Sequence, residues 1–378
     1  MELQLDDATL APIVESALGR RATIGAWHAV PFSYQVTNPL SAGIWRISGT
    51  ADDGGAPLDW SVILKVALSD YDVLLKRFPS ELRQELEHAY LWDREVLAYE
   101  SGIFDRLPPG LVAPRLFLAD RRADSCWLWL EDLGDGGGQW DVARYALAAR
   151  HLGRFNGAFP EGAFDAPWLT RDWIGTWILR GFGSRGAVVV ENDAIWAHPL
   201  VRDGFAAGAR ERLRRFLNYR ERIVQRLNAR PHALGHLDAF RKNLFDRTTA
   251  AGRRETAVID WSYLGYGPIG AELGHLVIGS VAFADYRQDI RALADACIPA
   301  YLDALRDVGW KGSVADVREG YALSAARWVS MLGWLSAVLD PARQQQMETW
   351  MGQPLAESVA QAGARTTYLL DLLEGALG

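Results

Sequence analysis

The chain has 378 residues, 49% of them hydrophobic and 23% charged, which is typical of a soluble globular protein with room for two lobes. A net charge of −7 gives no reason to expect general affinity for nucleic acid or for an anionic membrane. The acidic start of the chain lacks the apolar core of a signal peptide, and no apolar run approaches the roughly 20 residues that span a bilayer.

Two cysteines, Cys126 and Cys297, are too few for a disulfide framework or a metal-binding set. Both have apolar neighbours, so we expect buried thiols in a cytoplasmic protein. Nothing in the sequence indicates how many subunits assemble.

The first third of the chain is predicted to combine a sheet with helices. Residues 7–19 have the spacing of a short amphipathic helix. Residues 79–101 are rich in Glu, Leu and Ala at helical spacing and are predicted to form one long helix that Gly102 ends. Five alternating or β-branched runs, separated by turn residues, are predicted to be strands: 27–34, 43–48, 60–66, 112–118 and 125–130. The first three are predicted to form an antiparallel meander.

The remainder of the chain is predicted to be mostly helical. It begins after the glycine-rich stretch 134–138, and helices are expected over residues 141–155, 203–229 and nearly all of 270–378. One interruption, residues 231–267, contains the motifs that suggest chemistry.

This order of elements predicts an α+β protein with two lobes. The first lobe, residues 1–132, would contain an antiparallel sheet and one long helix, and the second lobe, residues 133–378, would be helical. A small sheet lobe, a glycine-rich hinge and a large helical lobe are typical of the protein-kinase-like fold, in which a nucleotide binds between the lobes.

The segment His236 to Asn243 has the spacing His-x-Asp-x4-Asn, which matches the catalytic loop of kinase-type phosphoryl transferases. In such a loop the Asp accepts the proton of the attacking hydroxyl and the Asn holds a metal ion. Asp260 ends an apolar run, residues 256–259, that has the composition of a buried strand. Asp260 fits the second metal-holding position of such a site. The alternative is an ordinary loop in which the Asp is a cap and the Asn is solvated.

Each of these side chains has a predicted role. Asp238 would be the base, and its main task would be to align the acceptor hydroxyl, because a carboxylate is a weak base at neutral pH. Asn243 and Asp260 would offer oxygens to Mg²⁺, which prefers hard ligands. His236 would brace the loop through hydrogen bonds. Lys242 could contact the transferred phosphate, although a solvated loop cation explains it as well.

The phosphates of a nucleotide need a cation from the first lobe, and Lys65 fits this role. It ends the apolar strand 61–65, where a buried Lys requires a partner. Glu95, on the helix that follows, is the candidate partner, and Glu85, Glu87 and Glu100 compete with it. The alternatives are a strand-end Lys that reaches solvent and a solvated helix face.

Two further segments are candidates for nucleotide contacts. Residues 130–133, including Glu131 and Leu133, follow a strand and precede the glycines, where a hinge would meet the adenine edge. Ser41 and Gly43 fall where a phosphate-covering loop is expected, but a single glycine is a weak signal.

Together these residues resemble the aminoglycoside phosphotransferase and choline kinase family. The resemblance rests on His236-Leu237-Asp238 with Asn243, on Ile259-Asp260-Trp261, and on the helix that opens at Gly270, and it covers roughly residues 30–280. It implies ATP as phosphoryl donor with GTP as an alternative, magnesium as cofactor, and a small-molecule hydroxyl as acceptor. Two positions depart from the family pattern: Leu237 replaces a usual Gly, and Glu272 stands where an Asp is usual.

We therefore expect a kinase for an aminoglycoside, a sugar or amino sugar, or an amino alcohol. A catalytically silent nucleotide-binding protein of the same fold and a metal-dependent phosphohydrolase are the alternatives. Tryptophans of the second lobe could stack on an acceptor or could be core residues. Acidic residues could face a polyamine-like sugar, or could lie on a solvated face: Asp285, Asp289, Asp295 and Glu319. Arg327 lies on an apolar helix and needs a partner, either the acceptor or an internal carboxylate.

Overall fold

The computed structural model describes residues 3–32, 40–72, 83–136 and 138–378. These residues form two compact units. Unit 1 contains Met1–Leu107, Val112–Gly136 and Asp246–Tyr263, and unit 2 contains Pro108–Leu111, Gly137–Phe245 and Leu264–Gly378. The predicted division at residue 132 lies close to the change of unit at Gly136. The segment Asp246–Tyr263, which contains Asp260, belongs to unit 1.

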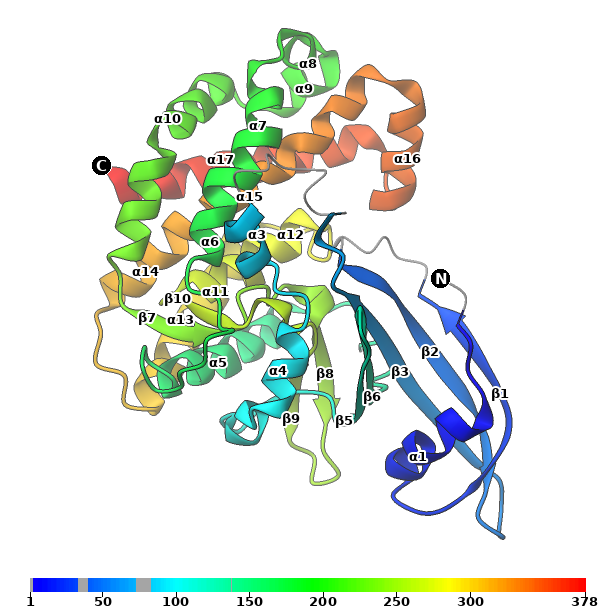
Figure 1. The fold of residues 1–378 in the computed structure, drawn as a ribbon. Coiled ribbons are helices and arrows are strands. Elements are labelled where there is room, and N and C mark those ends of the chain that lie inside the picture. Colours follow the sequence, from blue (N-terminus) through cyan, green and yellow to red (C-terminus); the bar gives the residue numbers. More distant parts are fainter. Residues whose placement is uncertain (1–2, 33–39, 73–82, 137) are drawn as a thin grey trace. The chain divides into compact units, whose positions relative to one another are not determined.

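Unit 1 is built on a five-stranded antiparallel sheet with the strand order β1-β2-β3-β6-β5 (Figure 1). The helix α1 (Asp7–Leu18) begins at the N-cap Asp6 and ends at Gly19 with φ 69°, as the sequence predicted. The strands are β1 (Thr23–Pro31), β2 (Ser41–Asp52), β3 (Leu58–Leu68), β5 (Leu116–Arg121) and β6 (Ser125–Glu131). Residues 33 and 34 of the predicted first strand lie outside the described residues.

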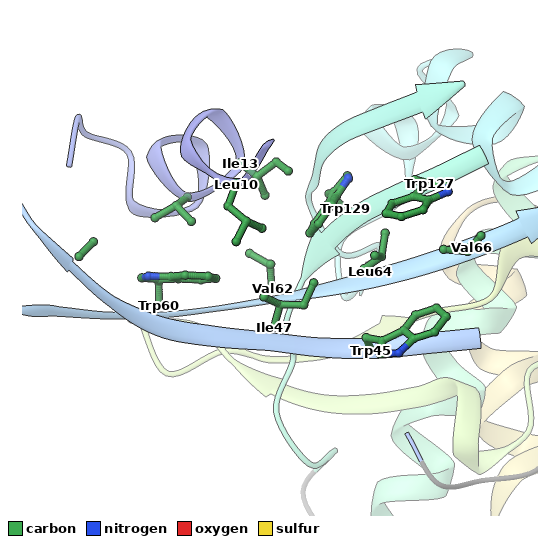
Figure 2. Close-up of a cluster of buried hydrophobic side chains, with 12 residues drawn as sticks. Leu10, Ile13, Trp45, Ile47, Trp60, Val62, Leu64, Val66, Trp127 and Trp129 are labelled. Atoms are coloured by element: carbon green, nitrogen blue, oxygen red, sulfur yellow. The ribbon is translucent and has the colours of Figure 1, made fainter. Parts of the chain in front are cut away.

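The strand β3 separates two cores because its side chains alternate between the faces of the sheet. Trp60, Val62, Leu64 and Val66 are buried on one face, in the same cluster as Leu10 and Ile13 of α1 (Figure 2). Ile63 lies on the opposite face and packs against a second cluster, Val96, Cys126, Leu128 and Leu130. Lys65 is two residues from Ile63 and therefore shares the face that α4 covers.

The predicted helix over residues 79–101 is wrong in the part that is described. The chain forms two short helices, α3 (Arg83–Ala89) and α4 (Arg94–Glu100), and residues 79–82 lie outside the described residues. The interruption follows from Arg94, which is fully buried. Its guanidinium donates to the carbonyls of His88 and Ala89. In a continuous helix, those carbonyls would accept bonds from residues 92 and 93.

The predicted strand over residues 112–118 is also divided. It becomes β4 (Leu111–Val112) and β5, and Pro114 lies between them. Proline has no N–H to donate to a ladder, so it interrupts the pairing. The strand β4 joins a second sheet with the order β4-β9-β8, made with β8 (Leu244–Thr248) and β9 (Arg254–Val258). Two short 3₁₀ helices complete unit 1, η2 (Ile103–Arg106) and η5 (Trp261–Tyr263).

Unit 2 is mostly helical, and α5 (Val142–Ala158) packs along α13 (Ile290–Asp307). Asp141 caps α5 by accepting the N–H of Arg144 at 2.7 Å. The predicted helix over 203–229 begins later, as α10 (Ala209–Asn228), because Gly208 before it is left-handed with φ 76°. The other helices before residue 230 are α6 (Trp173–Thr176), η3 (Trp177–Gly181), α7 (Phe182–Glu191), α8 (Asp193–Ala197) and α9 (Pro199–Gly204).

A two-stranded sheet and the catalytic-loop motif interrupt the helices of unit 2. The antiparallel strands are β7 (His232–Gly235) and β10 (Gly265–Pro268), and η4 (Arg241–Asn243) ends the motif. Beyond Gly270 the chain is almost entirely helical, as predicted: α11 (Ala271–Leu273), η6 (Gly274–Gly279), α12 (Ser280–Ala282), α13, α14 (Val314–Ser324), α15 (Ala326–Val329), η7 (Ser330–Leu339), α16 (Pro341–Met351) and α17 (Leu355–Leu377).

Both cysteines are buried and free, which confirms that part of the sequence prediction. Among the described residues, one helical run, Val314–Leu339, is long and apolar enough to cross a membrane by length and composition, which the sequence analysis did not anticipate. The protein itself buries 71% of its most apolar window. The buried core helix of a globular protein passes the same test, so this run is weak evidence for a membrane span.

Candidate functional site

Lys65 is the centre of a buried charge cluster in unit 1. Its Nζ lies 2.5 Å from Oε2 of Glu95 on α4 and 2.6 Å from Oδ1 of Asp260. Burial alone would lower the pKa of Lys65, but the charges of Asp260 and Glu95 outweigh it and raise that pKa well above its ordinary value. Lys65 is therefore a permanent cation. Three residues predicted separately from the sequence are in direct contact.

The backbone holds Asp260 in an unusual conformation. Asp260 is left-handed, with φ 62°, a region that Asp and Asn tolerate better than most residues. The next residue, Trp261, donates its backbone N–H to Oε1 of Glu95 at 3.2 Å, and the Ser262 hydroxyl donates to Oδ1 of Asp260 at 2.8 Å. Glu95 thus holds both Lys65 and the turn that follows the metal-binding candidate.

Arg94, which the sequence analysis did not single out, supports the same turn. Besides its bonds to the carbonyls of His88 and Ala89, its guanidinium donates to the carbonyl of Ser262 at 2.6 Å. Burial lowers the pKa of Arg94 to about 10, which leaves it charged at neutral pH. The signal available in the sequence was a charged residue beside Glu95, directly before the apolar Val96, Leu97 and Ala98.

We predict that Arg94→Met destabilises the protein by about 3–5 kcal/mol, because three carbonyls lose a buried charged donor. Urea unfolding would measure this change. The control is Arg83→Met, whose side chain is 56% exposed and which, among the described residues, pairs with Asp72 and Glu87. That change should cost less than about 1 kcal/mol. Equal losses in the two variants would show that Arg94 does not have this structural role.

Among the competing partners for Lys65, Glu87 and Glu100 have other contacts. Glu87 accepts from Arg83 at 2.7 Å, and Glu100 accepts from Arg121 at 2.8 Å. The side chain of Glu85 lies outside those that the structure describes.

The predicted hinge residues follow β6 in unit 1. The backbone N–H of Glu131 donates to the carbonyl of Arg115 at 2.9 Å, and the carboxylate of Glu131 accepts the N–H of Arg115 at 3.1 Å. Among the described residues, the backbone N–H of Leu133 has no partner. Asp132, between them, binds Arg46 at 2.8 Å and Ser61 at 2.5 Å, so the end of β6 is fixed to β2 and β3.

Ser41 and Gly43 begin β2. The Ser41 hydroxyl donates to the carbonyl of Val66 at 3.5 Å, a long bond, and the register shifts between Ser41 and Gly43. Gly43 has φ 147°, and a Cβ there would lie 2.7 Å from the Trp45 ring, so glycine is required. Most of the β1–β2 connection, residues 33–39, lies outside the described residues. The predicted phosphate-covering role remains a prediction.

In unit 2, Asp238 lies in the loop that follows β7 and is 8% exposed. Its Oδ1 accepts from Nη2 of Arg327 at 2.7 Å. Asn243 donates its amide to the Asp238 carbonyl at 2.9 Å, which leaves the Asn243 carbonyl oxygen for another contact. His236 is fully buried, and its Nδ1 accepts the N–H of Asp238 at 3.2 Å, as the proposed bracing role requires.

Leu237 has φ 60°, the conformation for which glycine is the usual residue. Two buried side chains hold the peptides on either side of it. Glu272 accepts the N–H of His236 at 2.7 Å and of Leu237 at 2.8 Å, and Arg327 donates to the carbonyl of Leu237 at 3.1 Å. The Leu237 side chain packs against Gly267. A Cβ at position 267 would lie only 2.6 Å from it. The departure from the family pattern at this position is therefore accommodated by specific contacts.

Lys242 is the most exposed of the predicted site residues. Its side chain is 54% exposed, and its Nζ lies 4.0 Å from the Asp285 carboxylate and over the Phe283 ring. Burial raises the pKa of Asp285 to about 6, although the cations Lys242, Arg241 and Arg287 lower it. Lys242 is thus held by contacts of its own unit, and contact with phosphate remains a prediction.

Burial raises the pKa of Glu272 to about 7, although its hydrogen bonds from the backbone of His236 and Leu237 lower it. The folded protein then binds a proton that the unfolded chain releases near pH 4.5. The stability from this group is fully present below about pH 4.5 and is lost as the pH rises through 7. We predict that, between pH 4.5 and pH 8, the free energy of unfolding of the wild-type protein falls by on the order of 3 kcal/mol relative to that of Glu272→Gln. Urea unfolding of both proteins across this range measures it, and a constant difference would contradict it.

The side chains predicted to hold a metal suit Mg²⁺ better than a metal that is bound entirely by protein ligands. Among the described residues, no group of three or more His, Cys, Asp and Glu side chains could hold a metal ion. Mg²⁺ typically binds one or two protein oxygens and completes its shell with water and substrate phosphates. Asp260 in unit 1 and Asn243 in unit 2 each have a side-chain oxygen of this type, and a role in holding magnesium remains a prediction for both.

Comparison with solved structures places the whole chain in a known fold. An aminoglycoside phosphotransferase from Alicyclobacillus acidocaldarius superposes with a TM-score of 0.53 at 15% identity, over 100% of this chain and 98% of that one. Weaker similarities include a choline kinase from Cryptosporidium parvum (TM-score 0.47, 12% identity, 93% and 90% of the chains) and an aminoglycoside phosphotransferase from Streptomyces rimosus with ADP and streptomycin (TM-score 0.42, 17%, 87% and 98%). No family model and no curated protein matches the sequence.

The chain therefore has the α+β protein-kinase-like fold that the sequence predicted. Its resemblance to the aminoglycoside phosphotransferase and choline kinase family extends to the fold of the entire chain.

Proposed function

We propose that this protein is a small-molecule kinase that transfers the γ-phosphate of ATP, or of GTP as an alternative donor, to a hydroxyl group with the help of Mg²⁺. The observation that carries the proposal is the contact of Lys65 with both Glu95 and Asp260. A strand Lys held by a helix Glu is the arrangement that kinases use to bind nucleotide phosphates.

The residues of unit 1 would bind the nucleotide. Lys65 offers a permanent buried cation for phosphate oxygens, and Asp260 would hold magnesium. The N–H of Leu133 would meet the adenine edge, and Ser41 and Gly43 would lie next to the phosphates. When bound, the metal would neutralise the charge that develops on the transferred group.

The residues of unit 2 would act on the acceptor. The acceptor hydroxyl would donate to the Asp238 carboxylate, which aligns it and takes its proton during transfer. Asn243 would present its carbonyl oxygen to magnesium because its amide N–H is already bound to Asp238. His236 would brace the loop, and Lys242 would approach the transferred phosphate. We infer a cytoplasmic protein that acts on a small molecule, with no nucleic acid or membrane partner.

A screen of nucleotide consumption tests the proposal. ADP release would be followed with ATP and Mg²⁺ in the presence of hexoses, amino sugars, aminoglycosides, hydroxy acids and amino alcohols. Turnover that depends on one acceptor class supports a kinase. Stabilisation by ATP and Mg²⁺ with no turnover on any acceptor would instead indicate a silent nucleotide-binding protein. Phosphate release from phosphomonoesters without nucleotide would indicate a phosphohydrolase.

A further inference from the structure

Arg327 has an unusual position for a buried cation. It lies on α15, is 7% exposed, and its Nη2 is 2.7 Å from Oδ1 of Asp238. The sequence left open whether Arg327 meets the acceptor or an internal carboxylate, and the structure shows the internal carboxylate. An acceptor hydroxyl aligned by Asp238 must come within about 3 Å of its carboxylate oxygens. Substituents of the acceptor near that hydroxyl then lie within about 6 Å of the guanidinium.

Aromatic rings surround the guanidinium of Arg327. Its Cζ lies 5.5 Å from the ring centroid of Trp173, 5.6 Å from that of Trp177 and 4.9 Å from that of Trp328. Indole faces beside a carboxylate are the chemistry that binds ammonium groups. Here an internal cation already occupies that environment, and the charge of Asp238 is already matched.

Most acidic residues that the sequence offered for a polyamine-like acceptor have other partners. Glu319 accepts from Arg226 at 2.6 Å and from Arg230 at 3.1 Å. Asp289 caps α13 by accepting the N–H of Arg291 at 3.0 Å. Asp295 lies on the exposed side of α13. Asp285 lies near the catalytic loop, but Lys242 is 4.0 Å from it.

We propose that Arg327 is a specificity-determining residue, and that the acceptor is an uncharged or acidic hydroxy compound instead of an amine. The proposal rests on the proposed kinase function. Arg327 stands where a cationic acceptor would otherwise bind between the indole faces and Asp238. Asp238 and Arg327 already match each other's charge, so an ammonium group close to the reacting hydroxyl finds no unmatched carboxylate and lies near the guanidinium, a like charge. An uncharged or acidic group lies near the same guanidinium without that repulsion.

The test compares acceptors in which one substituent is changed to a hydroxyl, a carboxylate or an amine. Two triads serve: glycerol, glycerate and aminopropanediol, and glucose, glucuronate and glucosamine. In each triad that is turned over, wild-type protein should favour the uncharged or acidic member over the amine by about tenfold or more in kcat/KM. A preference for the amine would overturn the proposal and leave the kinase function standing. If no acceptor of any class leads to consumption of ATP, the kinase function itself fails.

Variants of Arg327 separate specificity from folding. Arg327→Lys keeps the cation and should keep the order of preference. Arg327→Ala leaves a carboxylate, three indole faces and the buried His275 ring, so it should shift the order toward the amine. An Arg327→Ala protein that folds and keeps the wild-type order would contradict the proposal. As a matched control, Arg306→Ala, an exposed arginine on α13 that pairs with Asp303, should leave the order unchanged.

A binding measurement provides a readout that does not depend on turnover. Tetramethylammonium chloride at millimolar concentration should raise the Tm of Arg327→Ala, relative to the same concentration of sodium chloride, and should leave the wild-type Tm unchanged. Equal responses of the two proteins would show that Arg327 does not occupy a cation-binding environment. If Arg327→Ala fails to fold, the wild-type triads and Arg327→Lys decide the matter.

Discussion

Asp238→Asn is expected to lower kcat by about 10²–10⁴-fold, the usual contribution of a positioned general base. The amide cannot take the proton of the acceptor hydroxyl, and it aligns that hydroxyl less well than a carboxylate. Binding of the nucleotide with Mg²⁺ should change by less than about threefold, because Asp238 acts on the acceptor and not on the nucleotide. Coupled ADP release measures kcat, and calorimetric titration measures nucleotide affinity.

The choice of Asn over Ala follows from the Arg327 contact. Alanine would leave the buried guanidinium without its carboxylate, which typically costs about 3–5 kcal/mol and would confuse a loss of stability with a loss of activity. Asparagine keeps an oxygen that can accept from Nη2 of Arg327. Asp295→Asn, on the exposed side of α13, is the control and should retain wild-type kcat. If Asp238→Asn keeps a near-normal rate, Asp238 is not the base.

The residues that sequence reasoning identified lie where local patterns are informative. Lys65 shares a face of β3 with Ile63 because side chains alternate along a strand, and the alternation is visible in the sequence. Asp238 and Asn243 are five residues apart, so one loop brings them together. The fold class followed from the same local signals, a run of strands and then a run of helices.

The residues that sequence reasoning missed act over long separations. Arg94 lies 168 residues from Ser262, and the assignment of Arg327 to Asp238 spans 89 residues. No periodicity links such pairs, so the sequence shows only that a charged residue lies in an apolar helix and needs some partner. Glu272 was noted only as a departure from a family pattern. Its role in holding the peptides beside Leu237 depends on three-dimensional contacts.

The wrong helix boundary has the same origin. Residues 90–93, Tyr-Leu-Trp-Asp, contain neither Gly nor Pro, so nothing local ends a helix there. The interruption depends on Arg94, whose guanidinium takes the nearby carbonyls of His88 and Ala89 and also the distant carbonyl of Ser262. Tertiary contacts thus override helical propensity at this point. The predicted strand over 112–118 could have been divided correctly, because Pro114 is a local signal.

Asp260→Asn is expected to weaken binding of the magnesium–nucleotide complex by about 100-fold or more, since even the outer partners of metal ligands contribute roughly 10–100-fold. Asn retains the size of Asp and tolerates the left-handed φ of 62°, whereas Ala would add backbone strain. The substitution therefore removes the charge and preserves the turn.

Removing magnesium separates this role from a general loss of structure. Without the metal, Asp260→Asn should bind ATP as well as wild-type protein or better, because Lys65 loses one of its two carboxylate partners and becomes more available to phosphate. Titrations of ATP with Mg²⁺ and with a chelator, on both proteins, give the affinity gained from the metal. Asp59→Asn, an exposed change on β3, should keep the wild-type gain. If Asp260→Asn also keeps it, Asp260 is a partner of Lys65 alone and not a magnesium ligand.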